Sequence, residues 1–152
     1  MERVSRIIYC SRSRLTGGPP EIEAQIRKIL AKARIFNKKV HLSGAMSFNE
    51  SYFAQVLEGA DKDLLPLLYK IRRDERHTDM KVLLREENTP RIFSTWSMAY
   101  VEALAGSGRH PLSYFSFEAA LTDRAGPEGH QILATLSHVV LKRTKVLSGE
   151  AG

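Results

Sequence analysis

The sequence predicts an α+β fold: a five-stranded mixed sheet with two helices on one face and a C-terminal helical segment on the other. Two observations lead to this prediction. Five short segments have the apolar patterns of strands, and two longer segments among them repeat apolar residues at helical spacing. Their order is β-α-β-β-α-β-β, which is a ferredoxin-like order with one added strand.

The first strand and the first helix are predicted from the N-terminal third of the chain. Val4 to Ser11 has apolar residues at both parities, which is typical of a central strand covered on both faces. Gly17-Gly18-Pro19-Pro20 breaks the chain, and a helix follows that ends near Asn37. The apolar stripe of this helix consists of Ile22, Ile26, Ile29, Leu30 and Ala33.

The middle of the chain predicts a hairpin and a second helix. Val40 to Phe48 and Tyr52 to Leu57 are strand patterns joined by Asn49-Glu50-Ser51, so antiparallel pairing is expected. The stripe of the second helix consists of Leu64, Leu67, Leu68 and Ile71, and the helix runs to about Asp74.

Either Asp61 or Asp63 could cap the start of this second helix. Counted from Asp61, Pro66 would remove a backbone hydrogen bond inside the helix, whereas counted from Asp63 it lies in the tolerated first turn. We therefore expect Asp63 to be the cap.

Two further strands and a helical tail complete the prediction. Lys81 to Arg85 and Ile92 to Val101 are the strands, with Asn88-Thr89-Pro90 between them. After a loop at 106–109, Pro111 to Leu121 predicts a short helix. The last helix follows Gly126-Pro127, and its apolar side consists of Ile132, Leu136, Val139 and Val140. We expect residues 1–105 to form the main domain, and 106–152 to cap the bare sheet face or contact a partner.

Composition limits the class of protein. The 152 residues, 43% hydrophobic and 26% charged, fit one globular domain, and no apolar run approaches the ~20 residues that span a bilayer. The N-terminus lacks the pattern of a signal peptide, and the one cysteine, Cys10, cannot form an internal disulfide. We therefore expect a cytoplasmic protein without a membrane partner. The five histidines lack ligand spacing with one another, so no metal site is predicted.

The net charge of +6 raises the question of an anionic partner. The densest basic cluster falls on and just after the first predicted helix, and consists of Arg27, Lys28, Lys32, Arg34, Lys38 and Lys39. Charge runs on helices usually face water, so we interpret it as a solvated face and expect no nucleic acid. Lys142, Arg143 and Lys145 suit a helix C-terminus, or alternatively an acidic partner surface.

Four side chains stand out in the predicted strands: Tyr9, Gln55, Trp96 and Met98. A polar group inside an apolar strand needs a partner, and strand alternation gives Tyr9 and Gln55 each a definite face. Taken singly, such residues are typical of ordinary core positions, so the pattern alone leaves their role open.

Five short motifs together give a stronger indication. They are Tyr9 in a Tyr-x-Ser context, Phe36-Asn37, Gln55-Val56-Leu57-Glu58-Gly59, Asp74-Glu75-Arg76-His77 and Trp96-Ser97-Met98. In this order and spacing, the chain resembles the BLUF domains, flavin-binding blue-light sensors of bacteria. The resemblance covers about Arg3 to Val101.

The resemblance implies an FAD whose ring lies between the two helices, with Tyr9 and Gln55 as a light-driven switch. In this family the tyrosine can give an electron and then a proton to the excited flavin, and the glutamine amide turns over or tautomerises. Asn37 and Arg76 would bind the polar edge of the ring. The other implied site residues are Phe36, Phe53, Ile71, Asp74, His77 and Met98, with Trp96 as a relay. Which of Trp96 and Met98 faces inward stays open.

The resemblance also implies a photoreceptor that is not an enzyme. Its signal would pass through the last strand and the C-terminal helices to a downstream signalling protein or a homo-oligomer interface. FAD is expected, although FMN or riboflavin would suit the same ring site. Two alternatives stay open: a light-independent basic binding module for nucleic acid or protein, and an acylphosphatase-like hydrolase using Arg12 or Arg14 with Asn37.

Overall fold

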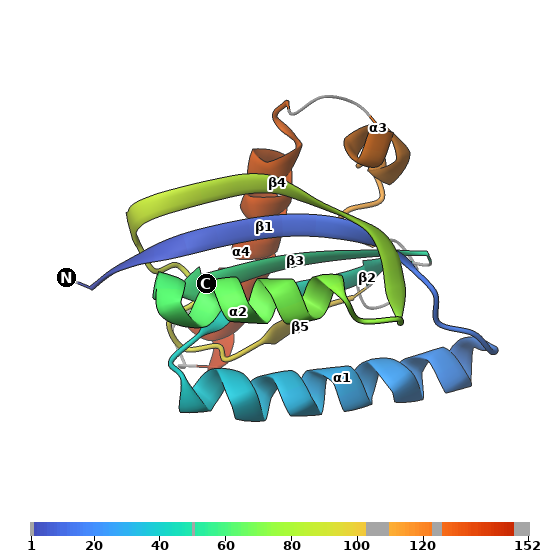
Figure 1. The fold of residues 1–152 in the computed structure, drawn as a ribbon, viewed down its shortest axis with the longest axis horizontal. Helices are drawn as coiled ribbons and strands as arrows, with labels where there is room; N and C mark the ends of the chain where they lie inside the picture. The colour runs from blue at the N-terminus through green and yellow to red at the C-terminus, as the bar shows by residue number, and fades with distance from the viewer. Residues whose placement is uncertain (1, 50, 103–109, 123–125, 148–152) are drawn as a thin grey trace.

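The computed structural model describes residues 2–49, 51–102, 110–122 and 126–147 (Figure 1). Five strands form one sheet in the order β4-β1-β3-β2-β5. The strands are β1 (Arg3–Ser13), β2 (Ser43–Asn49), β3 (Tyr52–Gly59), β4 (His77–Pro90) and β5 (Ala99–Val101). The helices are α1 (Pro19–Lys39), α2 (Asp61–Arg72), α3 (Phe117–Thr122) and α4 (Glu128–Leu147).

The sheet is mixed, as the sequence predicts. β1 pairs antiparallel with both β3 and β4, and β2 pairs antiparallel with β3 but parallel with β5. Residues 4–11 of β1 are all buried, so the apolar residues at both parities indeed mark a strand covered on both faces. The predicted element order and sheet type are therefore confirmed.

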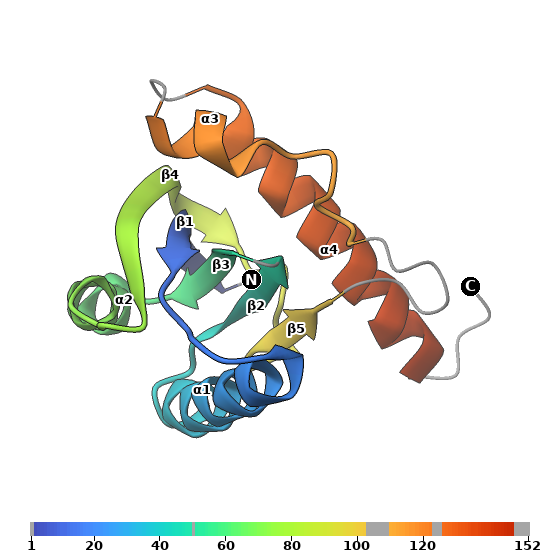
Figure 2. The same ribbon diagram turned by 90° about the vertical axis from the view of Figure 1, so that its right-hand side faces the viewer.

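Helices cover both faces of this sheet. Figure 2 shows α1 and α2 on one face and α3 and α4 on the other. Each face has its own apolar core. The α1/α2 core includes Ile7, Ile26, Leu30, Leu57 and Leu64. The α3/α4 core includes Ile8, Cys10, Val56, Phe93, Ile132 and Leu136.

The second helix begins earlier than predicted, so the choice of Asp63 as its cap is wrong. Helix α2 starts at Asp61 with Ala60 as N-cap, and the N–H of Leu64 already donates to the Ala60 carbonyl at 2.9 Å. Pro66 therefore lies inside the helix, where it cannot donate a backbone hydrogen bond. The helix forms without this hydrogen bond because the fully buried side chain of Leu64 packs its first turns against the sheet.

The last predicted strand is also much shorter than expected. Only Ala99–Val101 pairs in the sheet, and residues 91–98 form a connection with turns instead. Trp96 and Met98, which the sequence placed within this strand, therefore lie in the connection before it, so that prediction is wrong. The apolar residues of the connection are buried in the two cores without strand pairing: Phe93 joins the α3/α4 core and Met98 the α1/α2 core.

Smaller differences concern element ends. The hairpin strand β2 begins at Ser43 instead of Val40, and α1 continues past Asn37 to Lys39, which places Asn37 in its last turn. Glu50, the loop at 106–109 and the boundary between 105 and 106 fall outside the described residues, as does the side chain of Lys145. None of the described helices has the length and apolar character needed to cross a membrane.

Candidate functional site

A cavity of about 420 Å³ lies between the sheet and the helices α1 and α2. Strands β1 to β4, both helices and the turn after α2 all contribute to its wall. Of the ten predicted cofactor-binding residues, nine line it: Tyr9, Phe36, Asn37, Phe53, Gln55, Ile71, Asp74, Arg76 and His77. Met98, the tenth, contacts Gln55 behind the wall.

Tyr9 and Gln55 face each other across neighbouring strands. They are directly opposite in the β1–β3 register, and the Tyr9 hydroxyl donates a hydrogen bond to Gln55 Oε1. On its other side, Gln55 Nε2 lies 3.6 Å from the Met98 sulfur. Burial, with a smaller effect of Asp74, raises the pKa of Tyr9 well above its ordinary value. Tyr9 is therefore a neutral donor at physiological pH.

Asn37 binds the segment that precedes Met98, next to the Tyr9–Gln55 pair. Its side chain is buried, and Nδ2 donates to the carbonyl oxygen of Ser97 at 2.7 Å. Among the described residues, no protein group donates to its amide oxygen. One turn earlier in α1, Arg34 Nε donates to the Met98 carbonyl at 2.9 Å. The end of α1 thus holds two successive carbonyls of the segment that carries Met98.

Asp74 and Arg76 form an ion pair in the turn after α2. Asp74 Oδ1 accepts hydrogen bonds from both the backbone N–H and Nε of Arg76, each at 2.9 Å. This pairing lowers the pKa of Asp74 and raises the pKa of Arg76. Asp74 and Arg76 are both partly exposed at the cavity wall. A guanidinium has five N–H donors, and the bonds to Asp74 do not use all of them, so Arg76 can also donate to an anionic or carbonyl ligand.

His77 uses both ring nitrogens within the protein. Nε2 lies 2.5 Å from the Ile71 carbonyl, which can only accept, so this nitrogen carries the proton. Nδ1 then accepts from the Ser11 hydroxyl at 2.7 Å. The ring also meets Phe53 edge-on, with centroids 6.4 Å apart. His77 therefore lines the cavity and binds the end of α2 through the Ile71 carbonyl. Both of its ring nitrogens are used within the described part of the protein, so neither is available to a ligand.

The walls of the cavity are largely apolar. Phe53 is buried on β3, and the cavity is also lined by Ile71 of α2 and by the partly exposed ring of Phe36 on α1. A slot with apolar walls and a few polar groups is the usual form of a site for a planar aromatic ligand.

Trp96 lies away from this cavity. It is half-buried in the turn that follows Phe93 and packs against the α3/α4 core. Met98, only 1% exposed, is the inward residue of the two. The structure thus separates two side chains that the sequence left interchangeable.

Sequence reasoning missed part of the wall. The additional lining residues are Ile29, Lys32, Ala33, Met46, Leu57, Leu67 and Lys70. Met46 could have been predicted from the sequence, because counting residue pairs outward from the hairpin turn places it opposite Gln55. Lys32 and Lys70 carried no signal, since their charges look like those of any exposed helix face.

The residues needed for the hydrolase alternative are not together. Arg12 lies on β1, and its side chain pairs with Glu118 of α3 and, at 2.9 Å, with Asp79 of β4. Asn37 is buried against Ser97, and neither Arg12 nor Arg14 lines the cavity with it. This geometry offers no arginine loop facing a water-holding asparagine.

Comparison with known proteins finds a family that matches the chain from β1 to the start of β5. The family described as "BLUF: Sensors of blue-light using FAD" matches residues 4–99. Photoactivated adenylate cyclase subunit beta from Euglena gracilis is 35% identical over 94 residues, which are 61% of this chain and 11% of that protein. The chain thus spans only about a tenth of the length of such curated relatives.

Solved structures resemble more of the chain. BlrB, a BLUF protein in its dark state, is 26% identical, with a TM-score of 0.69 over 91% of this chain and 98% of that one. Klebsiella pneumoniae BlrP1 with FMN and cyclic diGMP is 28% identical, with a TM-score of 0.57 over 65% of this chain and 25% of that one. The likeness to BlrB includes the C-terminal helical region as well as the sheet.

Proposed function

Because the chain belongs to the BLUF family of blue-light sensors using FAD, we propose that its cavity binds a flavin between α1 and α2 and that Tyr9 and Gln55 form the light-driven switch beside it. The observation that supports this most is the direct hydrogen bond from the Tyr9 hydroxyl to the Gln55 amide at the cavity wall. Such a switch requires a buried hydrogen-bond donor next to an amide that can both donate and accept.

The residues of the cavity fit the ring of a flavin. The amide oxygen of Asn37, to which no described residue donates, can accept from a ring N–H, and Arg76 can donate to a ring carbonyl. Phe53 and Ile71 supply the apolar walls, and Phe36 can stack from α1. When bound, a flavin supplies absorption of blue light and acceptance of an electron and a proton in its excited state.

Gln55 has two orientations of unequal energy in this environment. With Oε1 toward Tyr9, each of its two contacts joins a donor to an acceptor. If the amide turned over, Oε1 would face the Met98 sulfur, and two acceptors would meet. This difference supports the present orientation as the resting one, to which we expect Gln55 to return in the dark.

We propose FAD as the flavin, in line with the family description. Lys32 and Lys70 are exposed cations on the cavity wall, on α1 and α2 respectively, and suit the phosphates of a dinucleotide tail. A relative, BlrP1, is described with FMN, so the cofactor must be identified directly. Chromatography of the flavin released from denatured protein would distinguish FAD from FMN and riboflavin.

We propose that the output leaves through β5 and α4, in a cytoplasmic protein with no catalytic activity of its own. Tyr100 of β5 offers its carbonyl to a hydrogen bond from Arg143 of α4, so a shift of the strand acts directly on the helix. The receiver would be a downstream signalling protein or a second copy of the chain. Relatives with a matching region include a photoactivated adenylate cyclase subunit, of which that region makes up 11%.

The decisive experiment is optical. The purified protein should be yellow, and blue light should produce a small reversible red shift of its flavin band. Tyr9→Phe and Gln55→Leu should keep the flavin but lose the shift, because each removes one side of the hydrogen bond. Tyr52→Phe is the matched control: it removes a tyrosine hydroxyl that bonds Glu118 outside the cavity, so its photocycle should be normal. A colourless protein that takes up no added flavin would refute the proposal.

A further inference from the structure

Glu58 belongs to the Gln55–Gly59 motif but has no part in the proposed switch. Glu58 lies three residues beyond Gln55 on β3, so its side chain points to the opposite face of the sheet. It is fully buried. A buried carboxylate is costly unless strong donors surround it, so its partners indicate what it is for.

The first partners come from a row of residues across the sheet. Arg6 on β1 and Ser43 on β2 are the direct cross-strand neighbours of Glu58, and Glu86 on β4 is the neighbour of Arg6. Arg6 Nε donates to Glu58 Oε2 at 2.9 Å, and Ser43 Oγ donates to Oε1 at 3.2 Å. Arg6 Nη1 reaches Glu86 at 2.7 Å. Four strands are thus linked at one level.

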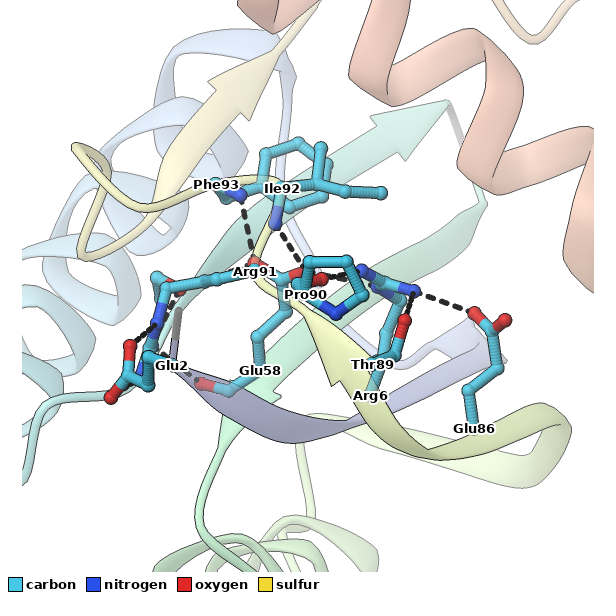
Figure 3. A network of polar contacts seen from close by, with 10 residues as sticks. Glu2, Arg6, Glu58, Glu86, Thr89, Pro90, Arg91, Ile92 and Phe93 are labelled. Atoms are coloured by element: carbon cyan, nitrogen blue, oxygen red, sulfur yellow. Dashed lines mark hydrogen bonds and ion pairs between the residues drawn. The ribbon is translucent and has the colours of Figure 1, made fainter.

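The remaining partners belong to the connection between β4 and β5. The backbone N–H groups of Ile92 and Phe93 donate to the two oxygens of Glu58, at 2.9 and 2.8 Å (Figure 3). Arg6 also holds the Pro90 carbonyl at 2.7 Å, just before them. All four groups around Glu58 donate, which suits an ionised carboxylate and makes the bonds charge-assisted.

The same connection carries Met98 to the switch. It passes from Phe93, buried in the α3/α4 core, to Met98, buried in the α1/α2 core against Gln55. Between them it is fixed at Trp96, whose carbonyl accepts from the Gly44 N–H at 3.1 Å. Glu58 therefore anchors the start of a short segment whose far end carries the sulfur that favours one orientation of the Gln55 amide.

We propose that Glu58 is a positioning residue for the switch: by holding the Ile92 and Phe93 amides, it sets where the Met98 sulfur lies relative to Gln55. This inference rests on the proposed function of Tyr9 and Gln55. Glu58 acts from the far face of the sheet and touches neither the cavity nor the switch pair. Loosening the anchor weakens the preference for the resting amide, so return in the dark becomes slower.

The first test needs no light. In Glu58→Gln, an amide nitrogen would face a backbone N–H where an oxygen now accepts, so amide hydrogen exchange at Ile92 or Phe93 should rise about tenfold or more. The NMR signal of the Met98 methyl group should move as well. Glu86→Gln is the matched control, because it removes the same charge from the same arginine without touching the connection. It should leave exchange at both amides and the Met98 signal unchanged.

The second test measures recovery of the holoprotein after blue light. Glu58→Gln should slow dark recovery about threefold or more, in the same direction as Met98→Leu, while Glu86→Gln stays close to the wild type. If the effect passes through Met98, adding Glu58→Gln to Met98→Leu should change recovery little further. Should Glu58→Gln fail to fold, Glu58→Asp keeps the charge, shortens the reach and is judged by the same two measurements.

The outcomes separate this inference from the proposed function. A wild type that binds flavin but shows no light-driven shift overturns both. A normal wild type in which Glu58→Gln behaves like Glu86→Gln overturns the role of Glu58 alone, as does a full additive effect on top of Met98→Leu. The role of Glu58 is supported if Glu58→Gln slows recovery in the wild-type background, causes little further slowing in the Met98→Leu background, and speeds amide exchange.

Discussion

At the scale of single residues, four polar side chains inside this sheet meet as two cross-strand pairs. Tyr9 meets Gln55, and Arg6 meets Glu58, through the same β1–β3 register. The two pairs lie three residues apart along each strand and so face opposite sides of the sheet. A register shift of one residue would break both pairs together, which ties the switch to correct folding of β1 and β3.

A buried histidine gives a prediction about pH. His110 Nδ1 accepts from the Leu112 N–H at 3.0 Å, and Nε2 lies 3.2 Å from both the Val101 carbonyl and Ser47 Oγ. A second proton on the ring would abolish the bond to Leu112, and burial lowers the pKa of His110.

Because the folded pKa of His110 lies below the unfolded one, the neutral ring stabilises the fold above pH 6.5, and this contribution is lost as the pH falls below it. Urea unfolding at about pH 7.5 and about pH 5.5 should show a smaller loss of unfolding free energy in His110→Asn than in the wild type. Equal losses would contradict a role for His110.

Residue identity was easier to predict than residue partnership. The resemblance named nine residues that line the cavity, yet the bonds of Glu58 with Arg6, Ile92 and Phe93 were not foreseen. The reason is physical: these partners depend on the register of β1 and on the path of a turn-rich connection, and neither leaves a periodic signal in the sequence.

At the scale of elements, helix α2 shows a local preference overridden by packing. Pro66 is exposed and lies inside the helix, while Leu64 beside it is completely buried. Capping and proline rules therefore predicted a later start, but burial of Leu64 and the bonds of Asp63 and Leu64 to Ala60 extend the helix toward β3.

This arrangement predicts a stabilising substitution. Pro66→Ala restores a backbone donor inside α2, and it should raise the unfolding free energy by about 1–2 kcal/mol after allowing for the greater freedom of the unfolded chain. Thermal unfolding followed by circular dichroism would measure it. Lys62→Ala, another exposed change in the same helix, should stay within about 0.5 kcal/mol. A loss of stability in Pro66→Ala would show that the proline is needed where it lies.

The shortness of β5 has a similar cause. The apolar residues from Ile92 onward suggest a strand, but burial in two different cores satisfies them without pairing. An apolar pattern reports burial, and only tertiary structure decides whether hydrogen-bonded pairing accompanies it.

At the scale of the whole molecule, the C-terminal helices α3 and α4 pack against the sheet. Ile132, Leu136 and Val140 are fully buried against the face of the sheet opposite the cavity. Tyr52 stacks on Phe117 at 4.8 Å, which ties α3 to β3. We therefore propose that α3 and α4 form a cap that folds with the sheet, and not an independent domain.

Two leucines of α4 allow a matched test of this proposal. Leu136→Ala removes a completely buried side chain and should cost about 2–5 kcal/mol of unfolding free energy. Leu141, 46% exposed on the same helix, should lose less than about 1 kcal/mol when changed to alanine. Urea unfolding of both variants measures the difference, and both should still bind flavin. If unfolding of the sheet were unaffected by Leu136→Ala, the helices would form a separate unit.

The 14-residue strand β4 has one more consequence, which concerns how the sheet ends. One side of β4 pairs with β1, and the other is an edge whose backbone groups could recruit a foreign strand and begin aggregation. Left-handed backbone at Asp79 and Asn88 bends the strand near both ends, and Lys81, Arg85 and Glu87 place charges between the bends. A second chain would have to follow the bends and bury those charges, so the molecule protects its longest open edge by shape and charge.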